Sequence, residues 1–202
     1  MKKVAIIGAG ISGLFIANLF KKKPNYQITI YEKNTTIALE EGYGVQLSVN
    51  SIRILNEIGF HKLGNNEKST PEKINFYSNW NSNKICELDI TKFNSEDCKY
   101  TTLKRSSLIN FLKIDLEDFI KTGYDISKID QRNKQIKLLF ENGQAYECDY
   151  LIISDGVFSK SKSLLFNSEA KPKYNNTLAA RGILTKSGEN IDIKNIAIFL
   201  GS

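Results

Sequence analysis

Two short apolar segments separated by an amphipathic stretch open the chain. Residues 2–7 are rich in β-branched side chains, as expected of a buried parallel strand. From Ile11 to Lys22 the apolar residues recur at helical spacing, and residues 27–32 form a second strand-like segment that ends in an acid. The N-terminal region therefore predicts a strand, a tight turn, a helix and a strand, which together make one βαβ unit.

Three later segments carry a helical period. After a loop with Gly42 and Gly44 at its centre, a helix is expected at about 50–59, with Gly59 at its end. A longer helix is expected over 105–122, followed by Gly123 as its C-cap. The buried stripe of this longer helix would consist of Leu108, Phe111, Leu112, Leu116, Phe119 and Ile120. A short helix is expected near 159–166.

The remaining segments show the alternation or the apolar composition of strands. Three segments separated by Asn/Ser-rich turns predict an antiparallel sheet at 73–77, 84–90 and 99–103. A small meander is expected from 127–132, 135–140 and 144–148, and a buried strand from 149–153. Two further strands are expected at 178–185 and 195–200. The whole pattern predicts an α/β fold in which a Rossmann-like domain, with a central parallel sheet and a small β-meander, accompanies an antiparallel sheet.

Composition and charge exclude several classes of protein. Hydrophobic residues make up 41% and charged residues 25% of the 202 residues, which is ordinary for a globular protein. No apolar stretch approaches the ~20 residues of a membrane helix. The apolar residues after Lys3 are too few for a secretion signal, so a cytoplasmic location is expected. The net charge is +6, but the lysines are scattered and only four basic residues are arginine, so nucleic-acid binding is not expected.

Cysteine and histidine offer little to catalysis or to a metal site. The three cysteines, Cys86, Cys98 and Cys148, are widely spaced and form no CxxC pair, which favours reduced thiols over zinc ligands or disulfides. His61 is the only histidine, so a mechanism that uses a Ser-His-Asp triad or a histidine base is not expected. No metal site is expected.

Gly8-x-Gly10-x-x-Gly13 is the strongest chemical signal in the sequence. At this spacing the first glycine permits the tight turn, the second lets a pyrophosphate approach the backbone, and the third lets helix and strand pack closely. The first turn of the helix, at Ile11 and Ser12, presents free N–H groups and a positive dipole end to the phosphates. Because the motif lies between a strand and a helix, it predicts a dinucleotide-binding site.

Glu32 stands at the end of the second strand, where such sites carry an acid. A carboxylate there accepts hydrogen bonds from ribose hydroxyls and repels a 2′-phosphate. The residues therefore indicate FAD or NAD, and not NADP, at this site.

Three further segments occur in a fixed order after the glycine motif. They are 42–59, which contains GYGVQLSVNS followed by R-x-L and I-G, 103–108 with LKRSSL, and 150–159 with YLIISDG and a serine. Together they resemble the FAD-dependent aromatic monooxygenases of the para-hydroxybenzoate hydroxylase class, which includes the ubiquinone-biosynthesis hydroxylases. The matching family patterns are G-x-G-I-x-L-x-P-N-A with L-x-x-L-G, then R-x-x-L, then D-x-L-V-G-A-D-G-x-x-S. The resemblance covers residues 3–162.

The resemblance implies FAD as the cofactor, with NADH or NADPH as co-substrate. It places the Arg105 guanidinium against the FAD pyrophosphate, although a surface arginine is the alternative. It brings Gln46 toward the flavin, where an ordinary loop amide is the alternative, and Asp155 near the flavin and the pyridine nucleotide. Asp155 could equally cap the helix after it. The predicted cofactor-binding residues are Gly8, Gly10, Ile11, Ser12, Gly13, Glu32, Lys33, Gln46, Arg105 and Asp155.

The sequence departs from the family pattern at several positions. Lys33 and Lys162 stand where arginine is common, Val49 where proline is usual, and Ser154 replaces alanine before Asp155. None of these changes removes a required chemical group. The family's Gly-Asp segment on a later strand is absent, so we expect an incomplete N-terminal portion of the family fold.

The resemblance implies a discontinuous FAD-binding domain at 1–70 and 101–166, and part of a substrate-binding β-sheet domain at 71–100 and 167–202. Aromatic surface in the latter region would come from Phe76, Tyr77, Trp80, Phe93 and Tyr100, most of which are expected to be ordinary core or surface residues.

The expected activity is an NAD(P)H- and O₂-dependent hydroxylation of a small aromatic molecule. Because the reduced flavin reacts with O₂ in this family, no catalytic side chain is nominated. The alternatives are a flavin-dependent reductase or dehydrogenase of the same fold, a non-catalytic FAD-binding fragment, and an NAD-binding dehydrogenase domain. Peripheral membrane association, the oligomeric state and the identity of the substrate stay open.

Overall fold

The computed structural model describes residues 1–37, 44–132, 135–166, 172–176 and 194–201. The chain divides into two compact units, each formed from two stretches of sequence. The first comprises Met1–Glu41 with Leu108–Ala179, and the second comprises Gly42–Ser107 with Ala180–Ser202. Each unit is described by itself.

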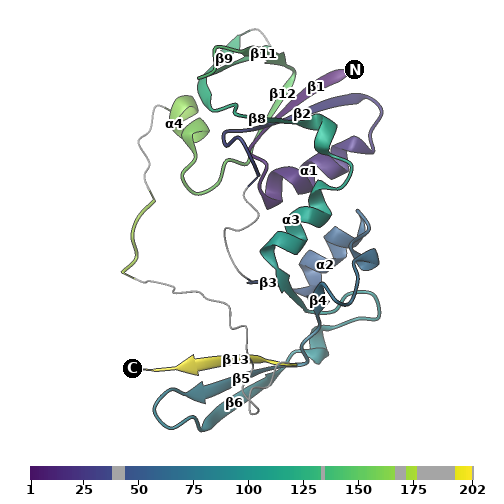
Figure 1. Cartoon of the computed structure of the whole chain (residues 1–202), viewed down its shortest axis with the longest axis vertical. Helices are drawn as coiled ribbons and strands as arrows, with labels where there is room; N and C mark the ends of the chain where they lie inside the picture. Colours follow the sequence, from purple (N-terminus) through teal and green to yellow (C-terminus); the bar gives the residue numbers. More distant parts are fainter. Residues whose placement is uncertain (38–43, 133–134, 167–171, 177–193, 202) are drawn as a thin grey trace. The chain divides into compact units, whose positions relative to one another are not determined.

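A four-stranded parallel sheet forms the centre of the first unit (Figure 1). Its strands are β1 (Lys2–Ile7), β2 (Tyr26–Glu32), β8 (Ile120–Thr122) and β12 (Tyr150–Ile153), in the order β12-β1-β2-β8. The helix α1 (Ile11–Lys21) connects β1 to β2 and confirms the predicted βαβ unit. Parallel neighbours on both sides require an apolar central strand, and the side chains of Val4 to Ile7 are accordingly buried.

The helices α1 and α3 (Arg105–Lys113) contribute buried leucines to the core of the first unit. Leu14 on α1 and Leu112 on α3 are fully buried. Between the two helices, the Asn18 side-chain amide donates to the carbonyls of Leu14 at 2.9 Å and Leu112 at 2.7 Å. The polar group inside this helix contact is therefore paired, as a half-buried amide requires.

The predicted meander is confirmed. Its strands β9 (Ile126–Arg132), β10 (Gln135–Phe140) and β11 (Ala145–Cys148) form an antiparallel sheet in the order β11-β10-β9. One apolar cluster joins this sheet to the parallel strands and consists of Ala5, Ile7, Tyr31, Ile126, Leu138, Phe140 and Cys148. The short helix α4 (Lys160–Phe166) follows β12 as expected.

The second unit contains two three-stranded sheets. In one, β7 (Thr101–Lys104) lies between β3 (Gly44–Leu47) and β4 (Lys68–Ser69) and is antiparallel to both. The helix α2 (Val49–Asn56) and the 3₁₀ turn η1 (Phe60–Lys62) follow β3, separated by Gly59 in the left-handed conformation with φ of 94°. The buried side chains of this helix and turn are those of Ile52, Leu55 and Phe60.

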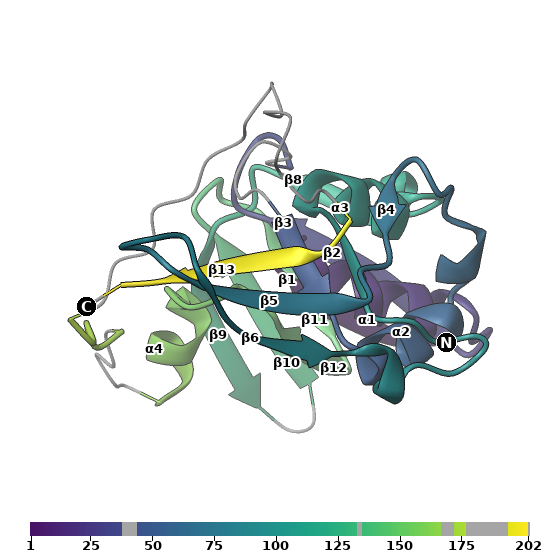
Figure 2. The ribbon, with the colours of Figure 1, turned by 90° about the horizontal axis from the view of Figure 1, so that it is seen from below.

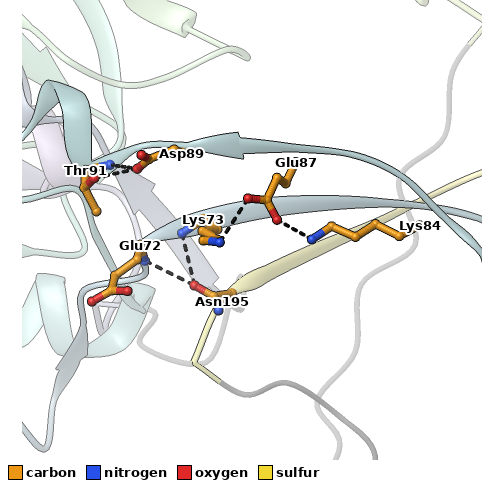
Figure 3. A network of polar contacts seen from close by, with 7 residues as sticks. All are labelled: Glu72, Lys73, Lys84, Glu87, Asp89, Thr91 and Asn195. Carbon is orange, nitrogen blue, oxygen red and sulfur yellow. Dashed lines mark hydrogen bonds and ion pairs between the residues drawn. The ribbon is translucent and has the colours of Figure 1, made fainter.

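In the other sheet, β5 (Lys73–Ser78) lies between β6 (Lys84–Asp89) and β13 (Ile196–Leu200) (Figure 2). β6 is antiparallel to β5, whereas β13 is parallel to it. Figure 3 shows how Asn195 ties the beginning of β13 to β5: its side-chain oxygen accepts the backbone N–H groups of Glu72 at 3.3 Å and Lys73 at 3.0 Å.

An exposed ionic network lies on the same strands. Glu87 on β6 pairs with the ammonium group of Lys73 at 2.9 Å and also with that of Lys84 (Figure 3). Hydrogen bonds from Lys84 and Lys73 lower the pKa of Glu87 to about 2. At the last residue of β6, the Asp89 carboxylate accepts the backbone N–H and the hydroxyl of Thr91, where η2 (Thr91–Phe93) begins.

The expected helix over 105–122 is wrong in its second half. The helix ends at Lys113, Asp115 takes a positive φ of 56°, and a 3₁₀ turn, η3 (Glu117–Phe119), leads into the strand β8. The apolar period misled the prediction because Leu116 is fully buried although it lies outside the helix. Gly123 has the expected positive φ of 75°, but it follows a strand rather than a helix.

Three other expectations need correction or fall on residues outside the described ranges. The segment expected at 99–103 forms β7, which pairs with β3 and β4 and not with β5 and β6. Gly44 begins a strand instead of continuing a loop. The strand expected at 178–185, and Gly42, lie outside the described residues.

The predicted domains, 1–70 with 101–166 and 71–100 with 167–202, divide the chain differently from the two compact units. Compactness reflects contacts within a unit, and it does not test which residues bind a cofactor. The domain boundaries therefore remain a prediction.

Candidate dinucleotide-binding site

The turn between β1 and α1 can be built only with glycine at its first position. Gly8 has a φ of +99°, and a Cβ atom there would lie 2.5 Å from the carbonyl oxygen of Ser154. Its own N–H donates to the carbonyl of Tyr31 at 2.8 Å, which holds the turn against the end of β2. Both the backbone conformation and the close approach of β12 therefore exclude a side chain.

The third glycine of the motif is required for packing. A Cβ atom on Gly13 would lie 2.0 Å from the carbonyl oxygen of Gly8, so any side chain would push α1 away from the turn. This close approach is the role that the sequence pattern assigns to the third glycine.

Gly10 differs from the other two because neither its conformation nor its packing requires glycine. Its φ of −79° and ψ of −175° are ordinary extended values, and apart from Gly10 itself and its two chain neighbours no described atom lies within 4 Å of the place that a Cβ would take. The space above Gly10 is thus open at the point where the motif is expected to admit a pyrophosphate.

The beginning of α1 can receive an anion. Gly10 is the N-cap, no side chain among the described residues caps the helix, and its first turn contains no acid. The first N–H groups of a helix have no partner within the helix, and the helix dipole favours negative charge there. Ile11 is half-buried and Ser12 is exposed in this first turn.

Glu32 is fixed beside the turn by two backbone N–H groups. One carboxylate oxygen accepts the N–H of Ala9 at 2.9 Å, and the other accepts that of Asn34 at 3.0 Å. Each carboxylate oxygen can accept more than one hydrogen bond, so ribose hydroxyls could still bind. The next residue, Lys33, is exposed.

Asp155 reaches the same turn from β12. Its Cα lies 3.0 Å from the position of a Cβ on Gly8. One carboxylate oxygen accepts the N–H of Ser161 in the first turn of α4 at 3.0 Å. Asp155 is nevertheless not the N-cap that the sequence allowed, because α4 begins at Lys160 and the hydroxyl of Ser159, directly before it, accepts the N–H of Lys162. The other carboxylate oxygen of Asp155 is buried and has no hydrogen-bond partner among the described residues, which leaves one acceptor able to pair with a donor.

The predicted residues are distributed over both units. The first unit brings together Gly8, Gly10, Ile11, Ser12, Gly13, Glu32, Lys33 and Asp155. Gln46 and Arg105 belong to the second unit. Gln46 is exposed on β3 and accepts the hydroxyl of Tyr100 at 2.7 Å, whereas Arg105 is half-buried at the first position of α3.

Sequence reasoning missed one residue of this site. The Ser154 hydroxyl donates to the carbonyl of Ile7 at 2.9 Å and also lies 3.4 Å from that of Gly8. The only signal in the sequence was the departure from alanine at this position of the family pattern.

No predicted cofactor-binding residue lines the cavity of about 900 Å³ in the second unit, whose floor includes Ile52, Phe60 and Thr101. Of the aromatic residues expected to offer surface, Trp80 and Phe93 are 81% and 65% exposed. Isolated exposed aromatics do not define a substrate pocket. Among the helices that the structure describes, none is long and apolar enough to cross a membrane.

Known proteins match the chain in sequence and in fold. Residues 6–40 match the NAD(P)-binding Rossmann-like domain. The chain is 26% identical over 186 residues to 6-hydroxynicotinate 3-monooxygenase of Pseudomonas fluorescens, a match that covers 90% of the chain and 47% of that relative. It is 24% identical over 190 residues to a salicylate hydroxylase of Pseudomonas putida, covering 90% of the chain and 43% of the relative.

A solved structure shares the fold. Klebsiella pneumoniae HpxO complexed with FAD and uric acid superimposes with a TM-score of 0.70 and 17% identity, over 80% of this chain and 41% of that one. The chain thus spans less than half the length of these proteins. The sequence matches and the shared fold relate the chain to the FAD-dependent aromatic monooxygenases, and it corresponds to their N-terminal portion.

Proposed function

We propose that the turn at Gly8–Gly13 binds the diphosphate of FAD and that the chain is the FAD-binding portion of a monooxygenase acting on a small aromatic substrate. The observation that carries this proposal is the open space at Gly10 in front of an uncapped helix, with the Glu32 carboxylate fixed beside it. These features match a diphosphate next to a ribose.

Each residue of the turn has a distinct task in this proposal. The N–H groups of Ile11 and Ser12 would donate to the diphosphate, because α1 provides no other acceptor for them at its beginning. The Glu32 carboxylate would accept the hydroxyls of the adenosine ribose. Asp155 would use its unpaired oxygen toward the cofactor.

Arg105, Gln46 and Lys33 complete the proposed set. Arg105 would contact the diphosphate, since a guanidinium binds phosphate oxygens in pairs. Gln46 would lie toward the flavin, and Lys33 would add positive charge beside the Glu32 end of the cofactor. These three roles are supported by the family resemblance alone.

The proposed activity follows from the relatives. FAD, reduced by NADH or NADPH, would supply the reaction with O₂ that hydroxylates the substrate. The names of the relatives specify hydroxynicotinate and salicylate as substrates of those proteins, which supports a small aromatic substrate here. A cytoplasmic location belongs to the proposal as well, supported by the free thiols of Cys86, Cys98 and Cys148.

Binding and turnover are tested separately. The purified chain is titrated with FAD, NAD and NADP, and binding is followed by flavin fluorescence and calorimetry. We expect FAD to bind and to give the visible flavin absorption of a yellow protein. A colourless protein that takes up NAD but not FAD would refute the proposal in favour of an NAD-binding domain.

Turnover is then measured as NAD(P)H oxidation with and without phenols and hydroxypyridines. Hydroxylated product formed in step with NAD(P)H oxidation supports a monooxygenase. NAD(P)H oxidation that no aromatic compound accelerates, with another acceptor reduced, would support a flavin-dependent reductase instead. FAD binding with no oxidation of NAD(P)H under any condition would support a non-catalytic FAD-binding chain.

A further inference from the structure

Ser154 contacts the glycine turn through both its backbone and its side chain. Its N–H donates to the carbonyl of Ile7 at 2.9 Å, which continues the pairing of β1 with β12 by one residue beyond Ile153. Its hydroxyl donates to the same carbonyl at 2.9 Å and lies 3.4 Å from the carbonyl oxygen of Gly8. One side chain thus joins the end of β12 to the first peptide of the turn.

The hydroxyl also lies close to the beginning of α1. The position of a Cβ on Gly13 is 2.8 Å from the Ser154 hydroxyl oxygen and 2.0 Å from the Gly8 carbonyl oxygen. The hydroxyl therefore occupies the narrow space in which strand, turn and helix meet. An alanine, which stands here in the family pattern that the sequence resembles, would fill part of this space but could not donate a hydrogen bond.

We propose that Ser154 is a positioning residue that holds the Gly8–Gly13 turn in its ligand-binding conformation. A partly buried hydroxyl bonded to a turn carbonyl restricts the rotation of that peptide, and the restricted peptide fixes where the N–H groups of Ile11 and Ser12 point. Preorganised donors bind an anion better because less order is lost on binding. The expected effect on cofactor affinity rests on the proposed function. The expected effect of Ser154 on the conformation of the turn does not.

The first test measures the turn without any cofactor. Backbone hydrogen exchange is followed at Gly8, Ala9 and Leu14, whose N–H groups donate to the Tyr31 carbonyl, the Glu32 carboxylate and the Gly10 carbonyl. In the Ser154→Ala variant we expect these three N–H groups to exchange about fivefold faster, the effect of losing one ordinary hydrogen bond. Ser154→Cys, with a weaker donor, is expected to give an intermediate rate.

The second test measures the dissociation constant of FAD, which we expect to rise by about fivefold in Ser154→Ala. Asn142→Ala is the matched control, because the Asn142 side chain also makes hydrogen bonds within the first unit, to the Gly123 carbonyl and the Gln144 N–H, but does not touch the turn. It should lower the unfolding midpoint while leaving the exchange of the three turn N–H groups and the FAD affinity unchanged.

The outcomes separate the two proposals. If Ser154→Ala lowers the unfolding midpoint as Asn142→Ala does, with exchange at the turn and FAD affinity both unaltered, Ser154 is only structural and the inference is overturned. If the wild-type chain binds no FAD, the proposed function fails, and the exchange rates still decide whether Ser154 holds the turn.

Discussion

Substituting Gly10 separates binding from folding more cleanly than substituting either other glycine of the motif. Its backbone is extended, with φ of −79° and ψ of −175°, and apart from Gly10 and its two chain neighbours no described atom lies within 4 Å of the Cβ position. Gly10→Ala and Gly10→Val should therefore fold. By contrast, Gly13→Ala would place a methyl group 2.0 Å from the Gly8 carbonyl oxygen and should disrupt the turn itself.

The expected cost to folding is small. Valine is a poorer N-cap than glycine, which costs roughly 1 kcal/mol, and the lower entropy of the unfolded chain returns about half of that. The cost to binding is larger, since a valine side chain would stand where the diphosphate must lie. Losing one or two charge-assisted hydrogen bonds costs about 3 kcal/mol, which is roughly a 100-fold rise in the dissociation constant.

The assay compares FAD affinity and chemical unfolding for the wild type, Gly10→Ala, Gly10→Val and Gly13→Ala. We expect affinity to fall with side-chain size at position 10, while the free energy of unfolding changes by no more than about 1 kcal/mol. Wild-type FAD affinity in a folded Gly10→Val protein would refute the assignment of the open space to the diphosphate.

Three other perturbations test the description of the site and the fold. Glu32→Gln should weaken FAD binding about tenfold in the same titration, because a neutral amide is a poorer acceptor for ribose hydroxyls; unchanged affinity would argue against a ribose contact. The pKa of Glu87 is lowered from 4.5 to about 2, so its stabilising effect is complete above pH 4.5 and is lost as the pH falls toward 2. The stability of Glu87→Gln should accordingly vary less with pH in that window, and identical acid unfolding curves would contradict the ionic network. Burial raises the pKa of the Cys148 thiol to about 11, so an alkylating reagent at neutral pH should modify exposed Cys86 well before Cys148, as read by mass spectrometry.

The sequence predicted the elements whose signals are local. The βαβ unit, the meander and the strand at β12 each carry a short apolar pattern bounded by glycine or a turn, and all three are observed. The expected burial of β12 is wrong, because Tyr150 and Ile153 are 49% and 37% exposed. The helix end at Lys113 was missed because Leu116 and Ile120 continue the helical spacing of apolar residues. Leu116 lies in the connection after the helix, and Ile120 is the first residue of β8. Whether an apolar residue is buried by a helix or by a neighbouring strand depends on tertiary pairing, such as Ile30 with Ile120, which no local pattern encodes.

The candidate site was predictable to the same extent. The roles of Gly8 and Gly13 follow from their spacing, and the structure supplies the physical reasons. Ser154 could be noticed only as an unusual residue, because its importance arises from the pairing of β12 with β1 across more than a hundred positions of sequence. The contacts of Gln46 with Tyr100 were likewise invisible until β3 was placed beside β7.

The pairing of β13 with β5 has a consequence for biosynthesis. On a ribosome, β5 and β6 emerge early, but the strand that lies against Ile74 and Phe76 is completed only at Leu200. Meanwhile residues 108–179, which belong to the other unit, are made and can join Met1–Glu41. The edge of β5 must therefore stay unpaired while residues 108–179 are made, which exposes this edge to mispairing. Contacts such as that of Asn195 with Lys73 can form only late in the assembly of this sheet.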